Sequence, residues 1–72
     1  MTREWQVMSG DMRGFFLRLA DDTANTGGYL LLFSRDFSDP AAEGFDEWYE
    51  RREDAEARIG SLDAVTVSEE HI

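Results

Sequence analysis

The chain contains no cysteine, no lysine, one histidine and one proline. Without cysteine it cannot form a disulfide framework, a thiolate zinc site or a thiol nucleophile. The single histidine, His71, is the residue before the last, where we expect no neighbours to hold a catalytic base in position. The sequence also lacks a Gly-x-Ser-x-Gly elbow and a phosphate-binding glycine motif. These absences predict a protein that is not an enzyme and has no catalytic residue, metal site or cofactor.

Long apolar runs are missing too. The longest covers residues 29–33, whereas a membrane-spanning helix needs about 20 apolar residues. No apolar region of the kind found in a signal peptide follows residues 1–5. We therefore expect a cytoplasmic protein that has no membrane partner.

The composition nevertheless supports a folded core. Of the 72 residues, 42% are hydrophobic and 12% are aromatic, which is more than a disordered acidic tail carries. The length predicts one small domain over residues 1–72. We expect a frayed polar tail at about 69–72.

Alternating apolar residues predict strands at 3–8, 15–20 and 29–34, and β-branched residues predict a last strand at 64–68. The third of these segments is apolar on both faces, which is typical of a central strand. Glycine-rich polar segments at 9–14 and 21–28 predict turns, and residues 35–44 predict a loop.

The pattern over residues 45–62 permits two interpretations. Helical spacing predicts a helix from about 46 to 59, with Asp46 as its N-cap. The apolar residues that show this spacing are Phe45, Trp48, Ala55, Ile59 and Leu62. Alternatively, the adjacent aromatics favour a fourth strand at 45–50 and a shorter helix that begins near Arg52. The expected fold is α+β: a small antiparallel sheet in the order β-β-β-α-β, or with that fourth strand, and one helix packed on a face.

The net charge of −9 is unevenly distributed. Residues 1–35 are neutral overall, whereas residues 36–72 hold twelve acidic residues and three arginines, which gives −9. On the predicted helix and just before it, four acidic residues recur at spacings of three or four, which places them on one face. They are Glu43, Glu47, Glu50 and Asp54, and Asp46 and Glu53 flank this row.

A row of carboxylates complements a basic surface, so the charge predicts a non-catalytic module that docks on a protein partner. Specific forms are an inhibitor, an immunity-like protein and a nucleic-acid mimic. Direct nucleic-acid binding is disfavoured, because a net charge of −9 repels phosphates. The alternative is that the acidic surface serves solubility or adaptation to high salt.

The aromatic residues predict a second surface. One helix covers one face of a sheet, so we expect Phe16, Tyr29 and Phe33 on the open face, where they could bind a partner or form a homodimer. A self-associating domain of this kind is the alternative function. A loop over residues 36–45 could instead cover that face with Phe37. Asp36, Asp39 and Glu43 fall short of the roughly six oxygen ligands of a calcium site, so we predict no metal there.

Overall fold

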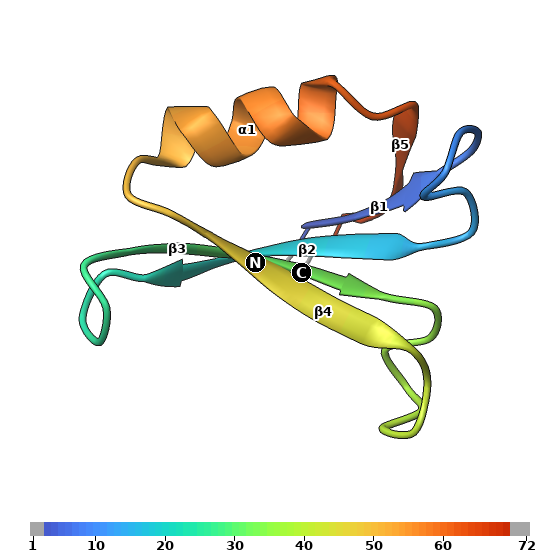
Figure 1. The fold of residues 1–72 in the computed structure, drawn as a ribbon, viewed down its shortest axis with the longest axis horizontal. Helices are drawn as coiled ribbons and strands as arrows, with labels where there is room; N and C mark the ends of the chain where they lie inside the picture. Colours follow the sequence, from blue (N-terminus) through green and yellow to red (C-terminus); the bar gives the residue numbers. More distant parts are fainter. Residues whose placement is uncertain (1–2, 70–72) are drawn as a thin grey trace.

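The computed structural model describes residues 3–69, which form a five-stranded antiparallel sheet and one helix (Figure 1). The strands are β1 (Arg3–Val7), β2 (Phe16–Asp22), β3 (Gly28–Ser34), β4 (Gly44–Tyr49) and β5 (Ala64–Glu69), and the helix α1 (Arg52–Gly60) lies between β4 and β5. The order in the sheet is β4-β3-β2-β1-β5. The first four strands form a meander, and α1 carries the chain across one face to the opposite edge. The structure confirms the α+β fold with a helix on one face.

The predicted strands at 3–8, 15–20, 29–34 and 64–68 correspond to β1, β2, β3 and β5. The turn expected at 21–28 is shorter than predicted, because Asp21 and Asp22 pair with Tyr29 and Gly28 and so extend the hairpin. Of the frayed tail expected at 69–72, only Glu69 is described, as the last residue of β5. The other residues of that tail, which include His71, lie outside the described residues.

Residues 45–50 do not begin a helix. The segment is in β4, which pairs with β3 in an unbroken register from Tyr29 opposite Tyr49 to Ser34 opposite Gly44. The predicted helix at 46–59 is therefore wrong over its first half, and the alternative of a fourth strand is confirmed. Asp46 is a strand residue, and the position before α1 is Arg51, which caps it with no side-chain hydrogen bond.

The core lies between α1 and the face of the sheet that α1 covers. Ala55 and Ile59, one turn apart on α1, are buried against this face. The buried side chains of the sheet and the adjoining turn are Val7, Phe15, Leu17, Leu31 and Phe33. The rings of Phe33 and Phe45 stack with centroids 4.4 Å apart, which extends the core towards β4.

The predicted aromatic patch of Phe16, Tyr29 and Phe33 is not formed. Tyr29 and Phe33 alternate with Leu30 and Leu32 along β3 and face α1, and only 2% of Phe33 is exposed. Phe16 lies on the opposite face, beside Ser34. The prediction was wrong because β3 is apolar on both sides, so its alternation cannot show which side the helix covers.

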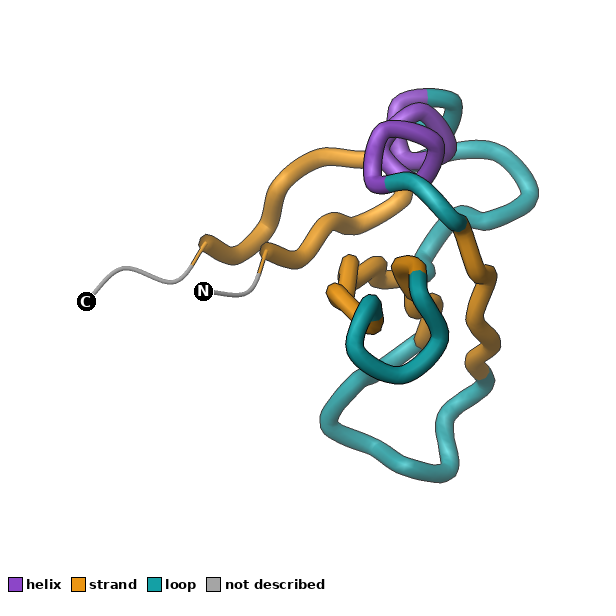
Figure 2. The backbone as a smooth tube through the Cα atoms, turned by 90° about the vertical axis from the view of Figure 1, so that its left-hand side faces the viewer, coloured by secondary structure: helices purple, strands orange, loops and turns teal. Residues whose placement is uncertain are grey.

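The face away from α1 is partly covered by the loop between β3 and β4. The guanidinium carbon of Arg18 lies 4.2 Å from the centroid of the Phe37 ring. The alternative prediction, in which Phe37 folds over this face, agrees with that contact. Figure 2 shows the sheet from the side, with β4 at one edge below α1 and with β1 and β5 extending away on the other side.

The one helix within residues 3–69 has nine residues and is not long and apolar enough to cross a membrane.

Candidate functional site

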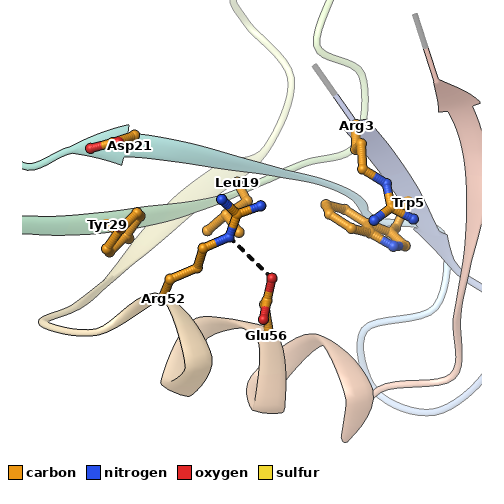
Figure 3. A pocket seen from close by; sticks show the side chains of 7 residues that line it. All are labelled: Arg3, Trp5, Leu19, Asp21, Tyr29, Arg52 and Glu56. Atoms are coloured by element: carbon orange, nitrogen blue, oxygen red, sulfur yellow. Dashed lines mark hydrogen bonds and ion pairs between the residues drawn. The ribbon is translucent and has the colours of Figure 1, made fainter. Parts of the chain in front are cut away.

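A cavity of about 390 Å³ opens between the first half of α1 and the sheet (Figure 3). Trp5, Leu19 and Tyr29 provide its apolar walls from β1, β2 and β3. The charged residues around it are Arg3, Asp21, Arg52 and Glu56. Two positive and two negative side chains give the cavity no net charge.

The charged groups of this cavity already have partners. Arg52 Nε lies 3.1 Å from Glu56 Oε2, and the guanidinium of Arg3 lies over the ring of Trp5. The hydroxyl and the backbone N–H of Thr23 donate hydrogen bonds to Asp21 and hold the pKa of its carboxyl below the usual value, with a smaller contribution from Arg52. The part of the lining without such partners is apolar, so the cavity suits an apolar or aromatic group.

The four acidic residues predicted to line one helix face, and the two predicted to flank it, are divided among four segments of the chain. Glu43 precedes β4, Asp46 and Glu47 lie on opposite faces of β4, Glu50 lies in the link to α1, and the last two residues begin the helix. Those two residues are Glu53 and Asp54. A continuous acidic row does not form, because a strand places successive side chains on alternate faces.

Glu47 connects β4 to the helix. Its carboxylate accepts hydrogen bonds from Arg58 at 3.1 and 3.3 Å and from the Tyr49 hydroxyl at 2.6 Å. Partial burial raises the pKa of Glu47, but the hydrogen bonds from Arg58 and Tyr49 outweigh it, so the pKa lies below its usual value. Burial and the bond to Glu47 raise the pKa of Tyr49. Arg58 therefore ties the Glu47 side chain of β4 to α1.

Other acidic residues form exposed ion pairs. Glu43 pairs with Arg35 at 3.3 Å, and Arg51 lies 3.2 Å from Asp54 and 3.9 Å from Glu53. Pairs this exposed are screened by solvent and contribute little to stability.

The loop acids Asp36 and Asp39 accept hydrogen bonds from Ser38 and from the Ala41 backbone. The Ser38 bonds keep the pKa of Asp36 below its usual value. Across residues 3–69, no three acidic or histidine side chains are grouped as metal ligands would be.

Two of the predicted acids have no such partner. Within the described part of the chain, neither Asp46 nor Glu50 forms a side-chain hydrogen bond or ion pair. Both are exposed, and Asp46 lies on the face of β4 that points away from α1. Their negative charges are therefore available to another molecule.

Trp48 lies beside Asp46 on the same face and is held in a defined position. Its indole N–H donates a 2.8 Å hydrogen bond to Thr26 Oγ1. Its six-membered ring lies over Gly28, where an added Cβ would be 2.5 Å from Trp48 Cζ2. Nevertheless 48% of Trp48 is exposed, so the ring forms a fixed platform. The predicted turn at 21–28 includes Gly28, which instead begins β3 beneath the Trp48 ring.

The backbone of β4 is unpaired on its outer side. Arg35 N–H donates to Glu43 C=O at 2.9 Å, and antiparallel pairs alternate between bonded and unbonded residues. Phe45, Glu47 and Tyr49 therefore direct their backbone groups towards β3, and Asp46 and Trp48 direct theirs outwards. In the described chain no strand lies beyond β4 (Figure 2). We call this free backbone side, together with Asp46, Trp48 and Glu50, the β4 edge surface.

Comparison with known proteins finds no matching family model, no similar curated protein and no similar solved structure.

Proposed function

We propose that the protein is a non-catalytic interaction module that binds a basic region of a partner protein through the β4 edge surface. One observation carries the proposal: the unpartnered carboxylates of Asp46 and Glu50 flank a half-exposed tryptophan on a strand with a free backbone edge. These features supply charge, contact area and hydrogen-bonding groups at one place.

The physical chemistry of interfaces supports this assignment. Complementary charge accelerates association and selects the partner, while a fixed aromatic residue is a frequent centre of binding energy. Trp48 is held by Thr26 and Gly28 and would therefore lose little side-chain entropy on binding. Among the forms considered, a docking inhibitor or immunity-like protein fits better than a nucleic-acid mimic, since the carboxylates do not form one regular row.

The test is quantitative affinity capture from cells of the source organism with three versions of the protein. Asp46→Lys reverses a charge on the β4 edge surface. Asp11→Lys is the matched control, because Asp11 is also exposed and, within residues 3–69, also has no side-chain partner, but lies in the turn between β1 and β2. We expect a basic partner that wild type and Asp11→Lys recover equally and that Asp46→Lys loses. A set of captured proteins that is identical for all three versions would refute the proposal.

A further inference from the structure

We propose that the occupant of the β4 edge surface is an extended segment with a basic residue at every second position, which adds to the sheet as a sixth, antiparallel strand. This inference rests on the proposed function and specifies the partner's chemistry and conformation. An extended peptide that joins a free sheet edge gains affinity from backbone hydrogen bonds and specificity from alternate side chains.

The two edges of the sheet differ in their ability to accept a strand. β4 pairs with β3 in one continuous register and contains no proline or bulge. At the other edge, the register between β1 and β5 shifts at Glu4/Trp5. A bulge of this kind twists an edge strand and interrupts the regular spacing that a new strand needs. β4 is therefore the better template.

The alternation of β4 specifies the side chains of the new strand. In an antiparallel pair, residues directly opposite each other share a face, and opposite Asp46 and Trp48 they also exchange backbone hydrogen bonds. A cation opposite Asp46 would meet an unpartnered carboxylate, and a cation beside Trp48 would lie over an exposed ring. On the other face, Glu47 is already bound to Arg58 and Tyr49, while 44% of Phe45 is exposed. That face favours apolar residues at the intervening positions.

Charge also decides against a second copy of this chain as the occupant. If two β4 strands paired antiparallel about their centres, Asp46 and Glu47 of both copies would lie within one residue of each other. Like charges opposite each other destabilise a strand pair. The same carboxylates attract a cationic segment, so the occupant is a basic strand of another protein.

The direct test uses a synthetic hexapeptide, Arg-Val-Arg-Val-Arg-Val, titrated into the ¹⁵N-labelled protein and followed by NMR. We expect the largest shifts at the backbone amides of Asp46 and Trp48 and at the Trp48 indole. A peptide of the same composition in the order Arg-Arg-Arg-Val-Val-Val carries the same charge without the alternation, and should bind at least about fivefold more weakly. Equal affinities for the two orders would overturn the inference.

Backbone methylation separates strand addition from simple charge attraction. N-methylation of two arginines removes N–H groups that face β4, whereas N-methylation of two valines alters N–H groups that face away. We expect the first change to weaken binding at least about tenfold and the second to have little effect. Equal binding of the two methylated peptides, or the reverse order, would overturn antiparallel strand addition.

Variants of the protein test which residues bind the peptide. Asp46→Asn should weaken binding of the alternating peptide about threefold, and Asp11→Asn should leave it unchanged. The opposite result would contradict the assigned surface.

The capture and peptide experiments together distinguish the two proposals. If Asp46→Lys loses the cellular partner but both methylated peptides bind alike, the proposed function stands and strand addition fails. If Asp46→Lys retains every captured protein, the proposed function itself fails.

Discussion

The contact between Trp48 and Gly28 yields a sharp prediction, because it depends on the absence of a single methyl group. A Cβ at Gly28 would be 2.5 Å from Trp48 Cζ2, 2.6 Å from Trp48 Cε2 and 2.5 Å from the Tyr49 carbonyl oxygen. The indole could rotate away, but the backbone oxygen belongs to the β3–β4 ladder and cannot move independently. Gly28→Ala should therefore force both the platform and the adjacent backbone to shift.

Two opposing effects set the change in the free energy of unfolding of Gly28→Ala. Overpacking of this kind costs about 1–3 kcal/mol, and the backbone contact places the cost in the upper part of that range. Replacing a strand glycine by alanine returns about 0.5–1 kcal/mol of chain entropy. The net loss is about 1–2 kcal/mol, which for a domain of this size lowers Tm by about 5–15 °C.

Thermal unfolding followed by circular dichroism measures the loss, and the NMR signal of the Trp48 indole N–H reports whether its bond to Thr26 is kept. Gly60→Ala is the matched control. Apart from the adjoining residues and the backbone of its own helix, no atom lies within 4 Å of the new Cβ, so the variant should be as stable as wild type or up to about 1 kcal/mol more stable. In a Trp48→Ala background, Gly28→Ala should cost less, since only the Tyr49 contact remains. Unchanged stability together with an unmoved indole signal in Gly28→Ala would refute this account of the platform.

Two further predictions concern the core and the Glu47 contacts. Leu31 is fully buried, so Leu31→Ala should cost about 2–5 kcal/mol in urea unfolding, whereas Val65→Ala, at a 46% exposed position, should cost well under 1 kcal/mol. Glu47→Gln should lower stability at neutral pH by about 1–2 kcal/mol, because it removes a charge that Arg58 and Tyr49 bind. The pKa of Glu47 is lowered in the fold, so its stabilisation is present above its unfolded value and is lost as the pH falls through the folded value. Wild type should therefore lose stability on acidification more steeply than Glu47→Gln; parallel urea-unfolding curves would contradict this.

Local patterns identified the strands that can be recognised from their own residues. Trp5 and Val7 alternate in β1, and Leu17 and Leu19 alternate in β2, because one face of each strand is buried against the helix layer. Near the C-terminus, Val65 and Val67 favour a strand through their β-branched side chains. These choices depend on adjacent residues alone, and sequence reasoning succeeds there.

The identity of β4 depends on a partner that is distant along the chain. Phe45, Glu47 and Tyr49 satisfy period two, but Phe45 and Trp48 also satisfy a helical spacing. Two distant contacts stabilise the strand and not the helix. The apolar strand β3 pairs with β4 along its length, and Arg58 of α1 binds Glu47. Neither contact can be read from the segment itself. For the same reason the acidic residues were correctly located in the sequence but wrongly assigned to one face.

The acidic residues form two groups, those with an arginine partner and those without one. The acidic residues with an arginine partner are Glu4, Glu43, Glu47, Glu53, Asp54 and Glu56. These pairs connect strands or support the helix, and they consume most of the positive charge. The other acidic side chains have no ion-pair partner in residues 3–69. Among them, Asp46 lies on the edge strand β4 and Glu50 lies next to it.

On an edge strand, this unpaired negative charge has two effects. A free sheet edge invites pairing with identical chains, and charged residues on the edge are the usual protection against it. Asp46 provides this protection against a second copy, because the copy brings the same charge. It provides none against a cationic strand, for which the same carboxylate is an attraction. Solubility and selective binding are therefore consequences of one arrangement, and the acidity of β4 need not serve only one of them.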